Sequence, residues 1–361
     1  MLVFKPLLSS VLVLPEQVLG LDLPQWDLLI RQARKANVLA TFNKLIEQAN
    51  LYDSVPEQPR RHLISARVHA ERFKISLDRE IECIIKALGD ITIPVVFLKG
   101  AAYQLANDRA AHGRVFSDID ILVPEDRLPE VELALIKGGW MTTTLDAYDQ
   151  KYYRQWMHEI PPMRHLKRQT TLDVHHNILP KTCRYSPDSA KLLSNCVKVA
   201  DRNGWVLATE DRVLHSASHL FHEGELDHGF RDLCDLDSLI KQHSKKSGFW
   251  DKLLLRADEL NQRIPLYYAL RYTHALLDTP IPENVLHEYE GVLKGRFHRY
   301  FMDFLYLRAL MPNHASCDDR WTGLARWLLY IRSHWLRMPM HLLIPHLLRK
   351  SWMRLRGKDE H

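Results

Sequence analysis

The stretch that decides the fold is FLKGAAYQLANDRAAHGRVFSDIDILV, residues 97–123, because it ends in an apolar run that carries Asp118 and Asp120. Residues two apart on a strand point to the same face, so both carboxylates face one way while Ile119 and Ile121 face the core. Two carboxylates this close repel each other, and a divalent cation removes the repulsion because it requires several oxygen ligands. For an isolated pair, however, the favoured interpretation is a solvent-facing pair screened by water and arginines.

The flanking residues favour a metal instead. The β-branched run before Gly100 predicts a buried strand, and the alanine-rich segment after it predicts a helix that ends at Gly113. This strand-to-helix turn, with Lys99 beside the glycine, presents backbone N–H groups where an anion can bind. Asp173, in the segment TTLDVHH, lies on a later predicted strand. Together, a glycine turn, an aspartate pair and a third acid suit a metal-bound triphosphate.

These motifs carry a resemblance. The segments FLKGAAYQLA, GRVFSDIDILV and LDVHHNI resemble the DNA polymerase β-type nucleotidyltransferase superfamily, and within it a bacterial nucleotidyltransferase family marked by LKG, SDIDLLV and D-x-H motifs. The resemblance extends over most of residues 23–245. It implies Mg²⁺-dependent transfer of a nucleoside monophosphate from an NTP to an acceptor hydroxyl, with release of pyrophosphate. Superfamily frequency alone favours ATP as the donor, and no motif specifies the base.

Carried over to this sequence, the resemblance assigns the catalytic residues. Asp118 and Asp120 would bind two Mg²⁺ ions, and Asp173 would be the third carboxylate, which bridges the catalytic metal and helps to deprotonate the acceptor hydroxyl. Gly100, with Lys99 before it, would occupy the turn that cradles the triphosphate. The superfamily turn usually reads Gly-Ser or Gly-Gly, so Lys99 departs from the pattern. A lysine there either pairs with a phosphate or partly closes the pocket.

Two further residues are candidates for supporting roles. Arg114 precedes the second strand, and its guanidinium matches phosphate oxygens; alternatively it pairs with Asp118 or Asp120 and keeps an unused site neutral. His175 shares the strand face of Asp173. It either orients that carboxylate from behind the metal ligands or simply hydrogen-bonds within a half-buried sheet.

A histidine set follows in a predicted helix. His215, His219 and His222 share one face at a spacing that can hold zinc, but no HExxH glutamate lies between the first two. We therefore favour a helix packed on the catalytic block over a metal site. Arg231 and Asp232 are expected to form an ion pair that anchors the next helix, with a substrate-facing role as the open alternative.

The order of predicted elements gives an α+β fold with a small mixed β-sheet. We expect an N-terminal helical region over residues 1–75, a nucleotidyltransferase core over 76–182 and a C-terminal helical region over 183–361. Within the core, residues 140–145 read as a strand, and residues 152–166 and 170–178 read as two strands joined by a polar turn.

The composition sets the broad class. The chain has 361 residues, 46% of them hydrophobic and 26% charged, which is ordinary for a globular protein of one or two domains. A net charge of +5 suits an anionic partner but is too small over this length to indicate nucleic acid. Five cysteines without CxxC spacing favour a reducing compartment. We expect a cytoplasmic protein; a signal peptide at the apolar N-terminus is the weaker interpretation.

The C-terminal end is basic and aromatic. Residues 320–358 contain no acidic residue but nine Lys or Arg, four Trp and one Tyr. This mixture is typical of helices on an anionic membrane surface and also of nucleic-acid-binding faces. We favour closing helices whose Trp and Leu pack inward, then contact with the inner membrane surface, with nucleic acid as a less favoured partner.

Two alternatives to the transferase stay open. One is a catalytically inactive nucleotide-binding or regulatory protein of the same fold, which the departure at Lys99 supports. The other is a peripheral-membrane accessory protein of surface-polysaccharide synthesis that depends on residues 320–358. The acceptor is not defined, because a small molecule, a sugar and a protein hydroxyl would all use the same three carboxylates.

Overall fold

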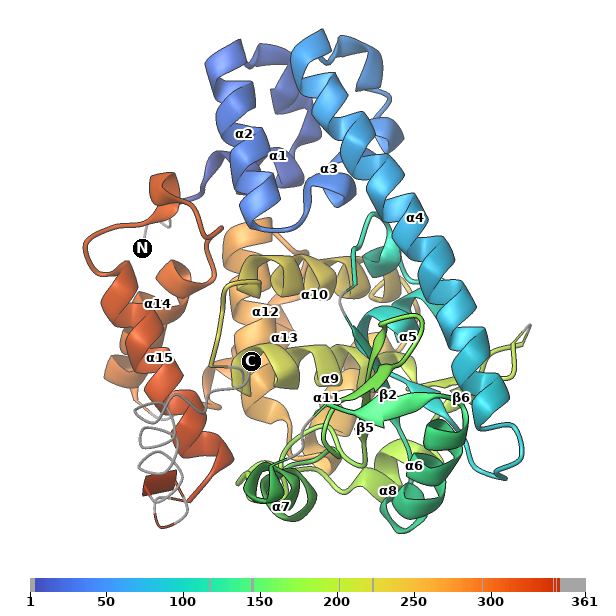
Figure 1. Cartoon of the computed structure of the whole chain (residues 1–361). Coiled ribbons are helices and arrows are strands. Elements are labelled where there is room, and N and C mark those ends of the chain that lie inside the picture. Colours follow the sequence, from blue (N-terminus) through green and yellow to red (C-terminus); the bar gives the residue numbers. More distant parts are fainter. Residues whose placement is uncertain are drawn as a thin grey trace.

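A computed structural model describes residues 4–116, 118–143, 146–200, 202–222, 224–293, 295–339, 341 and 343–344. It confirms the predicted α+β class, with one mixed sheet between helical regions (Figure 1). The described strands are β1 (Val96–Phe97), β2 (Asp118–Leu122), β3 (Trp140–Thr142), β4 (Met163–His165), β5 (Thr171–His175), β6 (Val197–Lys198) and β7 (Trp205–Val206). The described α-helices are α1 (Leu7–Val13), α2 (Leu23–Lys35), α3 (Leu39–Gln48), α4 (Glu57–Ala87), α5 (Lys99–Leu105), α6 (Leu128–Lys137), α7 (Ala147–Trp156), α8 (Ser189–Ser194), α9 (Thr209–His222), α10 (Gly229–His243), α11 (Phe249–Glu259), α12 (Arg263–Leu277), α13 (Glu283–Glu290), α14 (Arg296–Ala309) and α15 (Thr322–Arg337).

The sheet brings two distant motifs together. Within the described residues its strand order is β3-β4-β5-β2-β1-β7-β6. The neighbours β2 and β5 are parallel, and their register sets Asp120 directly opposite Asp173. β1 pairs antiparallel with β2, so the turn that follows β1 lies beside the start of β2.

Alternation along these strands gives the sheet two different faces. Ile121 and Val174 are fully buried and pack with residues of α4 and α6 in one apolar cluster. The other face carries Asp120 and Asp173, as the period of two predicts.

Two polar connections fix the sheet to its surroundings. The long helix α4 runs along one side of the molecule from the N-terminal helices to the sheet (Figure 1). Arg168, in the turn between β4 and β5, donates to the buried Glu80 of α4 at 2.7 and 2.8 Å. Asp108 is fully buried after α5 and accepts hydrogen bonds from Arg212 of α9 and His243 of α10. The loop that leads to β2 is thereby held against α9 and α10.

One strand prediction is wrong in part. Residues 152–156 belong to α7, and only Met163–His165 of the predicted strand 152–166 form β4. Tyr and Trp favour strands, but here they recur at helical spacing: the rings of Tyr152 and Trp156 lie 6.0 Å apart, centroid to centroid, one turn from each other. Strand pairing resumes after Pro161 and Pro162.

Other element boundaries also differ from expectation. α5 ends at Leu105, well before Gly113, and Asn107 then adopts a positive φ of 54°. β6 and β7 lie beyond the expected core boundary at residue 182, and β7 pairs parallel with β1. These strands have two residues each, too short to show any periodicity in the sequence.

The described part of the basic C-terminal end is the helix α15. Ala325 and Leu329 are buried, whereas Trp327 and Trp335 are 57% and 59% exposed. The prediction that these tryptophans pack inward is therefore wrong. The prediction for residues 345–358 lies outside the described residues. Within the described residues, no helix is both long enough and apolar enough to span a membrane.

Candidate functional site

Three carboxylates meet on the polar face of β2 and β5. Ligand oxygens of Asp118, Asp120 and Asp173 all lie within 4.8 Å of one another, and we call these residues the carboxylate triad. Asp118 is exposed, Asp120 is only 3% exposed and Asp173 lies between these extremes. The Oδ1 atom of Asp173 is buried and accepts no hydrogen bond from the described residues. An unsatisfied buried carboxylate oxygen is costly unless a ligand binds it.

The ammonium of Lys99 and the imidazole of His175 share one oxygen of Asp120. Lys99 Nζ and His175 Nε2 each lie 3.0 Å from Asp120 Oδ1. Although burial opposes it, the ammonium of Lys99 and the hydrogen bond from His175 hold the pKa of Asp120 well below its usual range. Lys99 therefore lies at the metal ligands themselves. His175 contacts Asp120 from behind, which fits one of the roles that the sequence left open for it, although the carboxylate it contacts is Asp120 and not Asp173.

The turn before α5 has a conformation that suits glycine. Lys99 has φ +43°, in the left-handed region that residues with a side chain adopt at a cost of about 1 kcal/mol. Gly100 is required for space, because a Cβ atom there would lie 2.0 Å from Cδ1 of Phe116. The Phe116 ring also lies under the Arg114 guanidinium, and its centroid is 5.7 Å from the central carbon, Cζ, of that group.

Arg114 lies near the triad but does not neutralise it. Its Nη2 lies 3.1 Å from Asp235 and 3.6 Å from Asp232, both on α10, so the predicted pairing with Asp118 or Asp120 does not occur. Its Nε and Nη1 atoms are buried and make no hydrogen bond to the described residues. Two guanidinium donors are therefore available to an anion.

A cavity of about 390 Å³ connects these groups. Asp118, Asp120, Lys99 and Arg114 line one part of it. A second part of the lining, which we call the cavity wall, comes from α9, α10 and the loop between them, and consists of Ser216, His219, Glu225, Asp227, His228, Arg231, Asp232 and Asp235. Among these residues, the sequence raised a substrate-facing role for Arg231 and Asp232. The Arg231–Asp232 ion pair that we expected does form, at 2.8 Å.

Burial leaves two aspartates with high proton affinity. Burial and the nearby Asp120 and Glu159 carboxylates raise the pKa of Asp173 to about 7. Burial also raises the pKa of Asp235 to about 7, against the opposing charge of Arg114. The site therefore carries more acid than its cations can neutralise.

The histidine set of α9 does not assemble a metal site. His215 and His222 are each 4% exposed, and His222 Nδ1 lies 2.9 Å from the carbonyl oxygen of Ser218. Within the described residues, the groups whose ligand atoms converge do not include these histidines. His219 instead lines the cavity.

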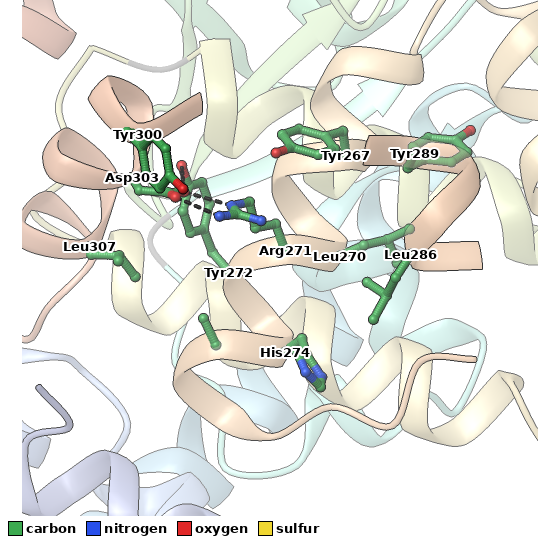
Figure 2. Close-up of a pocket in the computed structure, with 11 residues that line it drawn as sticks. Tyr267, Leu270, Arg271, Tyr272, His274, Leu286, Tyr289, Tyr300, Asp303 and Leu307 are labelled. Atoms are coloured by element: carbon green, nitrogen blue, oxygen red, sulfur yellow. Dashed lines mark hydrogen bonds and ion pairs between the residues drawn. The ribbon is translucent and has the colours of Figure 1, made fainter. Parts of the chain in front are cut away.

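A second cavity, of about 360 Å³, lies among α12, α13 and α14. Figure 2 shows Arg271 and Asp303 facing each other there, beside Tyr272 and Tyr300. Arg271 Nε donates to Asp303 Oδ1 at 2.6 Å. None of the predicted site residues lines this cavity.

The donors of the triad fit Mg²⁺. All three are carboxylates, Mg²⁺ prefers oxygen ligands, and the unpartnered Oδ1 of Asp173 is a ready ligand. A family model described as uncharacterised nucleotidyltransferase matches residues 22–278, a range that contains the triad and the whole cavity wall. Searches of curated proteins and of solved structures gave no match.

Proposed function

This chain belongs to the family of uncharacterised nucleotidyltransferases, and we propose that it transfers a nucleoside monophosphate from ATP to an acceptor hydroxyl with release of pyrophosphate. One observation carries the proposal: Asp118, Asp120 and Asp173 converge within 4.8 Å, and the first two line a cavity that is also lined by Arg114, two of whose guanidinium nitrogens have no partner among the described residues. A carboxylate cluster for a cation beside donors for an anion is what a metal–triphosphate complex requires.

The triad would hold Mg²⁺, which when bound supplies charge neutralisation for the attacking and leaving oxygens. The remaining work falls to the protein. Arg114 donates from Nε and Nη1 to phosphate oxygens while Asp232 and Asp235 fix its other end. Gly100 leaves room for Phe116, which supports the guanidinium from below.

We assign to Asp173 the acceptance of the proton of the acceptor hydroxyl, although Asp173 lies beside the residues that line the cavity and not among them. Its Oδ1 has no hydrogen bond from the described residues and is therefore able to accept a proton. The acceptor would bind beside the residues of α9 and α10 that line the same cavity as Asp118 and Asp120.

A nucleotide-binding protein without turnover is the second candidate function. The ion pair between Lys99 and Asp120 favours it, because the ammonium lies where it repels a cation. This alternative predicts NTP binding without release of pyrophosphate.

The first experiment follows thermal unfolding of the protein with each NTP, with and without Mg²⁺. A ligand that binds only the folded state raises stability by about 2.7 kcal/mol at a hundred times its dissociation constant. We expect an Mg²⁺-dependent shift with ATP that is absent from the Asp118→Asn/Asp120→Asn variant and unchanged in Asp90→Asn, which alters an exposed aspartate.

Turnover is then measured with α-labelled ATP and candidate acceptors of the small-molecule, sugar and protein classes. Label transfer with pyrophosphate release supports the transferase. A thermal shift without any pyrophosphate release favours the second candidate. A cooperative unfolding transition that no NTP shifts contradicts both.

A further inference from the structure

Behind the carboxylate triad, the segment after α7 lies alongside β5. Glu159 forms an antiparallel bridge with His175, and the backbone N–H of His176 donates to the carbonyl oxygen of His158 at 2.8 Å. One ligand atom from each of His158, Glu159 and His175 lies within 4.8 Å of the others. We call these residues the His–Glu–His cluster.

The cluster contains two imidazole nitrogens without partners. The Nδ1 atoms of His158 and His175 are both buried and make no hydrogen bond to the described residues. The two rings lie 5.1 Å apart, centroid to centroid, and 31° from parallel. His175 Nδ1 lies 3.3 Å from Glu159 Oε2, yet the pair lacks the geometry of a hydrogen bond. Buried polar atoms in this state point to a missing ligand.

The spacing suits ligands of one metal ion. Two ligand atoms bound at ~2.0–2.2 Å in a tetrahedral site lie ~3.3–3.5 Å from each other, as His175 Nδ1 and Glu159 Oε2 do. Two imidazoles and one carboxylate, with a position left for water, are ligands of zinc and of non-haem iron(II) rather than of Mg²⁺.

We propose that His158, Glu159 and His175 bind a divalent ion of the zinc and iron(II) class, distinct from the Mg²⁺ of the triad. His175 joins the two sites, because its Nε2 lies 3.0 Å from Asp120 Oδ1 while its Nδ1 faces the cluster. A metal on Nδ1 fixes the Nε2–H donor toward Asp120, in the carboxylate–histidine–metal arrangement common in metalloproteins. The ion therefore orients a triad carboxylate from behind.

The competing explanation is a protonated His175 that bridges two carboxylates, Asp120 and Glu159. The cations Lys99 and Arg337 also act on Glu159, and their charge opposes a metal ion. The metal reading accounts for one more observation, the buried and unpartnered Nδ1 of His158, which a proton on His175 leaves without a partner.

The test is metal binding, so it does not depend on the proposed enzyme activity. The full-length protein, stripped with a chelator, is titrated with Co²⁺, whose visible absorption reports nitrogen ligands, and then with Zn²⁺ as competitor. We expect one Co²⁺ per chain, bound with a visible band and displaced by Zn²⁺. His158→Ala and the nearly isosteric Glu159→Gln should weaken binding by more than the ~10–100-fold that loss of an outer partner causes.

The controls separate the two sites. Asp118→Asn/Asp173→Asn, which removes triad oxygens, should keep the Co²⁺ band, as should His69→Ala, which alters an exposed histidine. Cooperative unfolding of each variant verifies that it folds, and Glu159→Gln suffices if His158→Ala does not. A band that survives Glu159→Gln, a band lost with the triad variant, or no Co²⁺ binding by the folded wild type overturns the proposal.

Discussion

Replacing Asp173 by Asn should stabilise the metal-free protein at alkaline pH. Asp173 shares the face of the sheet with Asp118 and Asp120, and its buried Oδ1 accepts no hydrogen bond from the described residues. Burial and the neighbouring carboxylates raise its pKa from an ordinary 3.8 to about 7. An acid whose pKa is raised on folding contributes stability below its unfolded value, and that contribution is lost as the pH rises through the folded value.

The size of the effect follows from the two pKa values. At ~1.4 kcal/mol per pKa unit, the difference between 3.8 and about 7 corresponds to an upper limit of ~4 kcal/mol. Because Asp173 is not fully buried, water reduces this to the order of 2 kcal/mol. For a chain of this length, that is a rise in melting temperature of roughly 3 °C.

The assay is thermal unfolding with a chelator present, at steps from pH 5 to pH 8. The advantage of Asp173→Asn over wild type should grow between pH 5 and pH 7 and level off above. Asp235, whose pKa is also raised to about 7, contributes equally to both proteins and cancels in the difference. Asp90→Asn, an exposed substitution, should show no such trend. Added Mg²⁺ should stabilise wild type but not Asp173→Asn, because the variant lacks a ligand.

Two results would refute this reasoning. If Asp173→Asn is no more stable than wild type at pH 8 without metal, the triad does not hold unfavourable charge. If the advantage is present but does not change with pH, it comes from packing and not from ionisation. Either result would mean that repulsion among the triad carboxylates does not favour the binding of a cation.

Three further substitutions test the surroundings of the site. Gly100→Ala places a methyl group against Phe116 and should lower the free energy of unfolding by ~1–3 kcal/mol in a urea titration. Arg212→Leu leaves the fully buried Asp108 without its guanidinium partner and should destabilise by ~3–5 kcal/mol in the same assay. Lys99→Met removes a cation from beside the triad and should tighten Mg²⁺ binding by about tenfold, as measured by calorimetry. An unchanged affinity for Mg²⁺ would contradict the idea that the ammonium competes with the metal ion.

The local part of this fold could be predicted from the sequence. Alternation sets the faces of Asp120 and Ile121, because the side-chain period of a strand depends only on adjacent residues. Asp173 was singled out as an acid on a later predicted strand, and the family resemblance then assigned its role, but its pairing with β2 joins residues more than fifty positions apart and could not be read from adjacent residues. The helix α7 was missed because aromatic residues favour strands in isolation, while their spacing here builds a helical face.

The cavity wall could not be predicted. Arg114 contacts Asp232 and Asp235, which lie more than a hundred residues later on α10. That contact depends on how α9 and α10 pack beside the sheet, and the buried Asp108 fixes this packing through hydrogen bonds to both helices. In the sequence, Asp232 and Asp235 are only charges on an amphipathic helix, and solvent-exposed residues of a helix show the same pattern.

The charge distribution around Asp120 explains how one site supports either candidate function. Its Oδ1 already has two nitrogen neighbours, the ammonium of Lys99 and the imidazole of His175, whereas Asp173 has an oxygen without any hydrogen bond from the described residues. A metal ion at the triad therefore gains most from Asp173 and from the other oxygen of Asp120. Turnover requires Lys99 to remain beside that ion as an additional positive charge near the phosphates. If the ammonium instead takes the place of the ion, Arg114 can still hold a nucleotide, and the protein binds without reacting.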